Sequence, residues 1–402
     1  MTGSVLFWVQ HLLGIGHVRR ALRLVQALAR EGIAVTLVSG GEPLAEMHEA
    51  GAARVVQLPP LRSPDSTFKK LVDSAGRPVD DALWQARRAM LLDAVAAARP
   101  DAVLFETYPF GRSKFWPEID SLIAAVRASS AQAPLIASVR DIVVVGDKPA
   151  RRRAIVERVR DHIDAVLVHG DPAFIPLDDS FPETPRIRDR LIYTGYVGEI
   201  APATANSPGG EGAGEVLVSA GGGAMGNPLL RTAIEARRAG CLEGLTWRVL
   251  TGPNLPHAEF ASLAAGLPEG VVLERYRLDF PQMLRRCRVS VSQGGYNTTL
   301  DILAAGAAAV IVPFAGHDET EQRLRTERLA ARGLIEMVCE AELSPAALGA
   351  AIERAAARRP PRLAIDTGGA ARSARLIAAM IRRPRPGIDR FVRGASGGML
   401  DR

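Results

Sequence analysis

Short apolar runs alternate with longer helical patterns along most of the chain. In the first half, the expected strands are residues 4–10, 34–39, 101–106, 134–139 and 164–170. Between the first two, Val18, Leu22 and Val25 recur at the spacing of one helix face. Near-continuous apolar strands that alternate with helices are typical of a parallel sheet covered on both faces. We therefore predict an α/β fold.

The alternation stops at residues 196–214, YVGEIAPATANSPGGEGAG, which are rich in Gly, Pro, Ala and Ser and show no periodicity. It then resumes with further expected strands at 215–220, 246–251, 270–275, 288–292 and 308–313, each followed by a helical stretch. A chain of 402 residues exceeds the ~250–300 at which single cores usually stop growing. We therefore predict two α/β domains joined by a linker at 198–214.

The composition is that of an ordinary globular protein, with 47% hydrophobic and 23% charged residues. The N-terminus has no basic segment followed by an apolar run, and no apolar stretch approaches about 18 residues, so we expect neither a signal peptide nor a membrane span. The cysteines, Cys241, Cys287 and Cys339, are widely spaced and form no CxxC motif. This pattern favours free thiols in a reducing cytoplasm.

The net charge of +6 rests almost entirely on arginine. Basic residues cluster at 151–153 and in the tail RRPRPGIDRFVRG, but few aromatic residues lie among them, so we do not expect nucleic-acid binding. Peripheral contact with an anionic membrane at its inner face, or with a phosphorylated substrate, fits this charge better. A solvated basic face remains the favoured interpretation.

Three strand-to-helix turns are rich in glycine: QHLLGIGHVRR (10–20), SAGGGAMGNP (219–228) and SQGGYNTT (292–299). Ligands of open parallel sheets bind at the carboxyl ends of the strands, where these turns lie. A helix N-terminus offers unpaired N–H groups and partial positive charge, which suit phosphate. Two such turns in the second half predict a diphosphate site. The alternatives are tight turns without a ligand and, for Asn297 or Thr298, a simple helix cap.

Residues 221–226 also match the dinucleotide pattern GxGxxG, but the next strand, TWRVLTGPN, ends without the acidic residue that would hold a ribose. A nicotinamide enzyme is therefore the minor interpretation, and we expect no cofactor. Carboxylates lie elsewhere: Asp301 is one turn into the helix after the third glycine turn, and Glu321 precedes Gln322 near the start of a later helix. They could bind sugar hydroxyls, or could merely interact with the helix N-termini.

Among the histidines, His17 directly follows Gly14-Ile15-Gly16 and begins an expected helix, which makes it a candidate general base. Capping or packing is the alternative. His11 lies at the same strand end, His317 is a candidate for the sugar site, and His169 is left open. The sequence contains no D-x-D motif and no histidine pair with metal-ligand spacing, so we predict metal-independent chemistry. It also lacks the GxSxG and P-loop motifs, which argues against a serine hydrolase and a P-loop NTPase.

Taken in order, these features resemble the GT-B glycosyltransferases, specifically the family of the peptidoglycan N-acetylglucosaminyltransferase (glycosyltransferase family 28). The resemblance covers nearly the whole chain as a layout and is most specific over 288–333, RVSVSQGGYNTTLDILAAGAAAVIVPFAGHDETEQRLRTERLAARG. GGGAMG resembles the family's GGSxGA phosphate loop, and GIGHVRR its N-terminal glycine loop and histidine. The resemblance implies two Rossmann-like domains facing each other across a cleft. Their expected order is an acceptor domain (1–197), the linker (198–214), a donor domain (215–369), a helix crossing back (370–382) and a mobile basic tail (383–402).

The resemblance also implies site residues. Those expected to bind the donor are Gly222, Gly223, Arg277, Gly294, Gly295, Asn297, Thr298, Asp301, Glu321 and Gln322. The glycines and Thr298 would surround the diphosphate, Asp301 replaces a ribose-binding glutamate, and Glu321 and Gln322 replace a glutamine pair on the sugar. The segment around Arg277 would line the base pocket. His17 matches the catalytic base, and the expected acceptor contacts are Gly16, His11, Glu106 and Arg140.

The chain departs from the family pattern at several of these positions. Asp301 is one methylene shorter than glutamate, Glu321 carries a charge where an amide is usual, and Arg325 replaces an asparagine. The sequence therefore resembles a divergent relative. It predicts an inverting, metal-independent hexosyl- or N-acetylhexosaminyl-transferase that moves a sugar from a nucleotide-diphosphate donor, UDP-linked by resemblance, to an acceptor hydroxyl. The alternatives are a nucleotide-sugar epimerase or hydrolase of the same fold, and a non-catalytic nucleotide-sugar or nucleic-acid binding protein.

Overall fold

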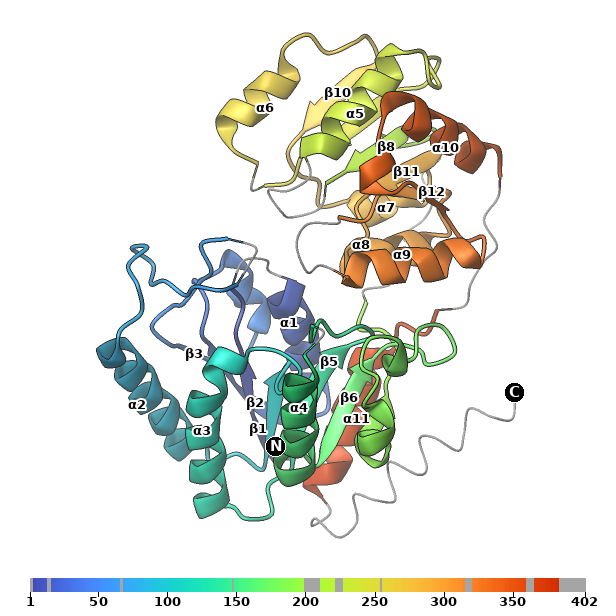
Figure 1. Ribbon diagram of the computed structural model, residues 1–402. Helices are drawn as coiled ribbons and strands as arrows, with labels where there is room; N and C mark the ends of the chain where they lie inside the picture. Colours follow the sequence, from blue (N-terminus) through green and yellow to red (C-terminus); the bar gives the residue numbers. More distant parts are fainter. Residues whose placement is uncertain are drawn as a thin grey trace. The chain divides into compact units, whose positions relative to one another are not determined.

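The computed structural model describes residues 3–12, 16–65, 68–146, 148–198, 210–220, 227–253, 255–314, 320–358 and 365–382. The chain divides into two compact units. Unit 1 comprises Met1–Val197 and Asp366–Arg402, and unit 2 comprises Gly198–Ile365. Each unit is an α/β structure built on one parallel sheet, which confirms the predicted fold class (Figure 1).

The sheet of unit 1 has seven strands in the order β3-β2-β1-β4-β5-β6-β7. Their bounds are β1 (Gly3–Val9), β2 (Ile33–Ser39), β3 (Arg54–Gln57), β4 (Ala102–Glu106), β5 (Leu135–Arg140), β6 (Ala165–His169) and β7 (Leu191–Tyr193). The order reverses between β1 and β4, which pair in parallel. In open α/β sheets such a reversal opens a crevice at the carboxyl ends of the two strands, and ligands bind there.

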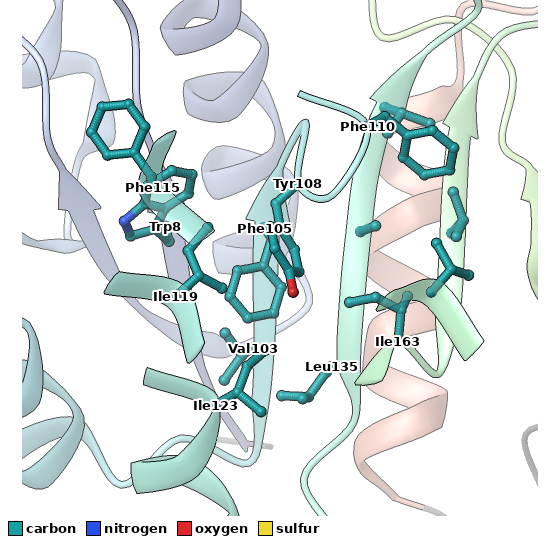
Figure 2. Close-up of a cluster of buried hydrophobic side chains, with 14 of the residues drawn as sticks. Trp8, Val103, Phe105, Tyr108, Phe110, Phe115, Ile119, Ile123, Leu135 and Ile163 are labelled. Carbon is teal, nitrogen blue, oxygen red and sulfur yellow. The ribbon is translucent and has the colours of Figure 1, made fainter. Parts of the chain in front are cut away.

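Helices cover both faces of this sheet. They are α1 (Gly16–Arg30), α2 (Asp81–Ala98), α3 (Trp116–Ser129), α4 (Pro149–His162) and α11 (Gly369–Ile381), with short 3-10 turns η1 (Ala45–Ala50), η2 (Ser113–Phe115), η3 (Leu177–Asp179) and η4 (Thr184–Arg190). Successive strand residues point to opposite faces. Thus Val103 and Phe105 pack with residues of α3 (Figure 2), whereas Ala102 and Leu104 pack in a second core with α1 and α11.

The sheet of unit 2 has the order β10-β9-β8-β11-β12-β13. Its strands are β8 (Val216–Ser219), β9 (Trp247–Leu250), β10 (Val271–Glu274), β11 (Val289–Ser292), β12 (Ala309–Ile311) and β13 (Glu336–Met337). Its helices are α5 (Asn227–Arg238), α6 (His257–Ala264), α7 (Phe280–Leu284), α8 (Tyr296–Ala305), α9 (Glu321–Ala331) and α10 (Pro345–Ala357), with the 3-10 turn η5 (Glu340–Glu342). Here the order reverses between β8 and β11, so the two glycine-rich turns of this unit follow adjacent strands, as predicted.

All strands expected from the apolar pattern are present, within one or two residues at each end. The pattern missed β3, β7 and β13, which have two to four residues each and lie at the edges of the sheets. Edge strands this short leave too few alternating positions for a recognisable period. Of the helices in the described ranges, none is long and apolar enough to cross a membrane.

Candidate active site

A set of polar side chains gathers at the carboxyl edge of the unit 1 sheet, on the face that α1 covers. In β4, Glu106 points to this face because Phe105, the residue before it, packs on the other one. In α1, His17 and Arg20 are three residues apart and so lie on one side of the helix. Strand alternation and helix periodicity thus bring Glu106 together with His17 and Arg20.

The Glu106 carboxylate is 1% exposed and is held by several donors. Nδ1 of His17 lies 3.0 Å from its Oε1, and Oγ1 of Thr107 lies 3.2 Å from the same atom. The guanidinium of Arg20, itself 2% exposed, also donates to Oε1. The polar contacts of the His17 ring with the described residues all involve Nδ1. Because a carboxylate only accepts, Nδ1 carries the proton, donates it to Glu106 and leaves the lone pair on Nε2. The 3.3 Å contact of Nδ1 with Arg20, which is itself only a donor, is then not a hydrogen bond.

The charges around this pair set the protonation states. Burial alone would raise the pKa of Glu106, but the Arg20 guanidinium and the hydrogen bond from His17 outweigh it and hold that pKa well below its usual range. Burial lowers the pKa of His17 to about 3 against the opposing hydrogen bond to Glu106, and the charges of Arg112 and Arg140 lower it further. At neutral pH, His17 is therefore a neutral imidazole next to a carboxylate, which is the state required of a general base.

The second carboxylate oxygen of Glu106, Oε2, contacts the neighbouring strand β5. Oγ of Ser138 donates to Oε2 at 2.9 Å and also lies 2.9 Å from Nε2 of His169. Nδ1 of His169 is 2.8 Å from Oγ1 of Thr194. The sequence left His169 open and did not single out Ser138 or Thr194. For Ser138 and His169 a signal was available, because each is a polar residue in an expected strand that is otherwise apolar. Thr194 directly follows β7, which the apolar pattern missed.

The other residues predicted to contact the acceptor lie at the same edge of unit 1. Gly16 begins α1, Arg140 ends β5, and His11 follows β1. The His11 ring is 5% exposed and packs on Gly41, where any side chain would collide with it. Burial lowers the pKa of His11, and a hydrogen bond with the backbone of Glu42 opposes that shift.

In unit 2, the two glycines before α8 have different surroundings. A Cβ on Gly294 would lie 2.7 Å from Oγ1 of Thr326 and 3.2 Å from the carbonyl oxygen of Gln322, so this glycine allows α9 to pack closely. A Cβ on Gly295 would meet no atom of the described residues within 4 Å. Gly295 is the N-cap of α8 and provides no side chain to bond the first N–H groups of the helix.

The remaining donor candidates of this unit lie near α8 and α9. Asn297 and Thr298 are half-buried in the first turn of α8, and Asp301 is half-buried in the next turn. Oε1 of Gln322 accepts a hydrogen bond from the backbone N–H of Phe314 at 3.1 Å. That bond involves the acceptor end of the amide.

Glu321, an expected sugar contact, is buried next to Arg325. It is 4% exposed, and its Oε1 pairs with Nη2 of Arg325 at 2.9 Å. Nη1 of Arg325 donates to the carbonyl oxygen of Gly294 at 3.2 Å, and the guanidinium stands 5.4 Å from the ring centre of Tyr296. Arg325, which replaces the family's asparagine, therefore ties α9 to the glycine turn, with Glu321 as its counter-ion.

Arg277 also makes ion pairs. Its guanidinium bonds to Asp279 at 2.9 Å and to Glu211 at 2.7 Å, which holds the turn between β10 and α7. These hydrogen bonds raise the pKa of Arg277. The expected site residues Gly222, Gly223 and His317 lie outside the described residues, as do most of the linker (199–209) and the C-terminal tail (383–402).

Comparison with known proteins shows that the second half of the chain is similar to a family of glycosyltransferase domains. Residues 217–377 match the Glycosyltransferase family 28 C-terminal domain. This segment is similar to family 28 glycosyltransferases. A curated relative, an uncharacterized glycosyltransferase of Methanopyrus kandleri, is 30% identical over 167 residues, which are 41% of this chain and 45% of the relative. The match thus spans less than half of that relative's length.

The segment similar to family 28 lies within a chain whose whole fold resembles solved glycosyltransferases. The calicheamicin glycosyltransferase CalG4 matches over 100% of both chains with a TM-score of 0.58 and 20% identity. The kitacinnamycin glycosyltransferase matches over 98% of both chains with a TM-score of 0.59 and 18% identity. MurG of Acinetobacter baumannii covers 98% of this chain and 99% of its own, with a TM-score of 0.55 and 14% identity. The chain therefore has the GT-B fold.

Proposed function

We propose that the protein is a glycosyltransferase that moves a hexosyl or N-acetylhexosaminyl group from a nucleotide-diphosphate sugar to an acceptor hydroxyl. We take UDP as the first candidate nucleotide, and we propose that the reaction inverts the anomeric configuration and needs no metal. The similarity to the family 28 domain supports the class of donor. One observation carries the chemistry: His17 is held through Nδ1 by a buried carboxylate, and its Nε2 remains to accept a proton.

In this mechanism, the acceptor hydroxyl gives its proton to Nε2 of His17 as its oxygen attacks the anomeric carbon. A new carbon–oxygen bond forms while the bond to the diphosphate breaks, and the nucleoside diphosphate leaves with the electron pair. The single displacement inverts the configuration. Glu106 stabilises the imidazolium that forms. A base in this position typically contributes 10²–10⁴-fold to the rate.

The donor is assigned to unit 2. The start of α8 at Gly295, with Thr298 in its first turn, supports binding of the diphosphate, because preorganised N–H groups stabilise the charge that develops on the leaving group. Gly222 and Gly223 follow the adjacent strand and complete this site in our proposal. Asp301 and the amide of Gln322 are proposed to bind the ribose and the transferred sugar. The backbone around Arg277 is proposed to line the base pocket.

The acceptor is assigned to the carboxyl edge of unit 1. His11, Gly16 and Arg140 remain the proposed acceptor contacts. For Glu106, we propose an orienting role instead of acceptor binding, because its oxygens already receive hydrogen bonds from His17, Arg20, Thr107 and Ser138.

A ligand panel tests the proposal. Thermal unfolding should be measured with nucleoside diphosphates and their sugars, because a ligand at 100 times its dissociation constant stabilises by ~2.7 kcal/mol. A shift with at least one nucleotide sugar supports the donor site. A melt that none of them shifts, together with salt-dependent binding of nucleic acid, would overturn the proposal in favour of a binding protein.

Incubation with the bound nucleotide sugar alone separates transfer from the alternatives of the same fold. Epimerised donor or free sugar, formed in the absence of acceptor as fast as transfer in its presence, would favour an epimerase or hydrolase. Turnover retained after removal of divalent cations by a chelator, with product of inverted anomeric configuration, supports the proposed chemistry.

The net charge of +6 supports peripheral contact with an anionic membrane at its cytoplasmic face. Co-sedimentation with vesicles of neutral lipid, with and without an anionic lipid, tests this contact. Binding only to the anionic vesicles, and its loss at high salt, is the expected result.

A further inference from the structure

A row of buried polar side chains crosses the unit 1 sheet beneath α1 and α11. It has one member at the carboxyl end of each of the adjacent strands β4 to β7: Glu106, Ser138, His169 and Thr194, each at most 1% exposed. In every strand, the residue two positions earlier belongs to the core that faces α1 and α11: Leu104, Ile136, Leu167 and Ile192. All four polar side chains therefore point to the same face, where His17 lies.

The direction of each proton in this row follows from the chemistry of its members. Glu106 is a carboxylate and can only accept, so the single hydroxyl proton of Ser138 must go to its Oε2. Oγ of Ser138 then accepts from Nε2–H of His169. Burial lowers the pKa of His169 to about 3, so the ring is neutral, and with its proton on Nε2 the lone pair on Nδ1 faces Oγ1 of Thr194 at 2.8 Å. Thr194 can also donate to the carbonyl oxygen of Gly195 at 3.0 Å, but at this Nδ1–Oγ1 distance one of the two atoms must donate, so the hydroxyl proton goes to Nδ1. His169 and His17 must consequently be opposite tautomers: Nε2–H in His169 and Nδ1–H in His17.

Thr194 is itself fixed where the chain leaves unit 1 and where it returns. Its carbonyl oxygen accepts a hydrogen bond from Nη1 of Arg372 at 2.5 Å, and Arg372 pairs with Asp366. The backbone N–H of Tyr196 donates to the carbonyl oxygen of Asp366 at 2.7 Å. The row thus runs without a break from the candidate base to the two crossing segments, at 194–197 and 366–369.

We propose that Ser138, His169 and Thr194 are positioning residues for His17, an inference that rests on the glycosyltransferase proposed above. They hold Oε2 of Glu106 so that Oε1 faces His17, and they spread the charge of Glu106 over the row. Arg20 and Ser138 withdraw charge from the carboxylate that His17 faces. Without the proton from Ser138, Glu106 would attract the proton of His17 more strongly, and the base would become easier to protonate.

The test compares Ser138→Ala with Ser39→Ala. Ser39 ends β2 of the same sheet, is fully buried, and its hydroxyl has no hydrogen-bond partner within the described residues, so it controls for the loss of a buried hydroxyl. Nitrogen-15 NMR of the histidine rings gives tautomer and titration without any substrate. We expect opposite neutral tautomers for His17 and His169, and an increase in the pKa of His17 of ~0.5–1 in Ser138→Ala only. Ser138→Thr, which keeps the hydroxyl, should restore the original value.

Thr194→Val supplies a second, nearly isosteric variant in case Ser138→Ala does not fold. It removes the donor to Nδ1 of His169 but keeps the acceptor of Nε2–H on Ser138, so His169 should retain the Nε2–H tautomer. Two results would refute the positioning role of Ser138, His169 and Thr194. One is an Nδ1–H tautomer of His169 in the unaltered protein, and the other is the same pKa of His17 in Ser138→Ala and Ser39→Ala. The acid limb of kcat/KM should move to higher pH in Ser138→Ala. If the NMR results are as expected but no nucleotide sugar is turned over, the hydrogen-bonded row and its effect on His17 are supported, whereas the proposed glycosyltransferase function is refuted.

Discussion

Among single residues, Glu106 illustrates how surroundings decide a role that residue type leaves open. A buried carboxylate on its own carries a desolvation penalty of several kcal/mol and tends to take up a proton. Here Arg20, His17, Thr107 and Ser138 supply donors, so the charge persists. The sequence predicted its place at a strand end, but those donors come from α1 and from β5, at sequence separations of 86, 89 and 32 residues for Arg20, His17 and Ser138.

Replacing His17 by alanine tests the base. His17→Ala should lower kcat by at least about a hundredfold, because the acceptor proton loses its destination, and should leave the dissociation constant of the donor unchanged. Steady-state kinetics and calorimetric binding measure the two effects. His48→Ala removes an exposed histidine from η1 of the same unit and serves as the control. Similar kcat values for the two variants would remove His17 from the mechanism.

The pH dependence of the reaction gives a second residue-scale prediction. With a pKa of about 3, His17 stays unprotonated in the free enzyme across the ordinary working range. The value of kcat/KM should therefore change less than about twofold between about pH 7.5 and 5.5, whereas an unperturbed histidine of pKa ~6.5 would lose about tenfold. A tenfold acid loss in the measured profile would contradict the proposed environment of His17.

At the scale of elements, the start of α8 combines a packing glycine with an open one. Gly294 lies against Thr326 of α9, so its lack of a side chain serves the contact between two elements. Among the described residues, Gly295 lies in open space with extended backbone, φ −62° and ψ 148°, which alanine also adopts. Adjacent glycines that look equivalent in the sequence therefore have separable functions, one structural and one proposed for phosphate.

These two glycines give an element-scale prediction. Gly294→Ala should lower the melting temperature, because a methyl group 2.7 Å from Oγ1 of Thr326 forces α8 and α9 to adjust. Gly295→Ala should fold normally but weaken nucleotide-sugar binding by about tenfold or more, because the methyl group keeps a phosphate from the backbone N–H groups. Thermal unfolding and calorimetry measure both. Unchanged donor affinity in Gly295→Ala would argue against this diphosphate site.

For the whole molecule, both units place their chemistry at the point where strand order reverses. In unit 1, the strand order reverses between β1 and β4; Glu106 ends β4, and His17 lies in α1, the helix after β1. In unit 2, the order reverses between β8 and β11, and a glycine-rich turn follows each of these strands in the sequence. The same topological rule thus locates both proposed half-sites.

Burial of the neutral histidines also predicts acid sensitivity of the fold. His17 and His169 have a pKa of about 3 when folded and an ordinary 6.5 when unfolded, so below pH 6.5 the unfolded chain binds more protons. Their contribution to stability is complete above pH 6.5 and is lost progressively as pH falls toward 3, by up to ~1.4 kcal/mol per pH unit for each histidine.

Urea unfolding between about pH 7.5 and 5 measures this loss, with tryptophan fluorescence as the signal, because Trp8, Trp84 and Trp116 lie in unit 1. The free energy of unfolding should fall with pH, and His169→Gln should reduce the slope because it removes one titrating group. Stability that stays constant or rises toward pH 5 would contradict the protonation states assigned to the row.

Local periodicity determined the strand and helix pattern, the α/β class, the glycine-rich turns and the position of His17 at the start of a helix, because each depends on residues within a few positions of one another. Tertiary structure alone decided the rest. It placed Glu106 in contact with His17 and connected Ser138, His169 and Thr194 to Glu106 by hydrogen bonds. It also formed the ion pair between Glu321 and Arg325. Those partners depend on which strands are neighbours and which face a helix covers. Long-range packing sets that geometry, and no local pattern records it.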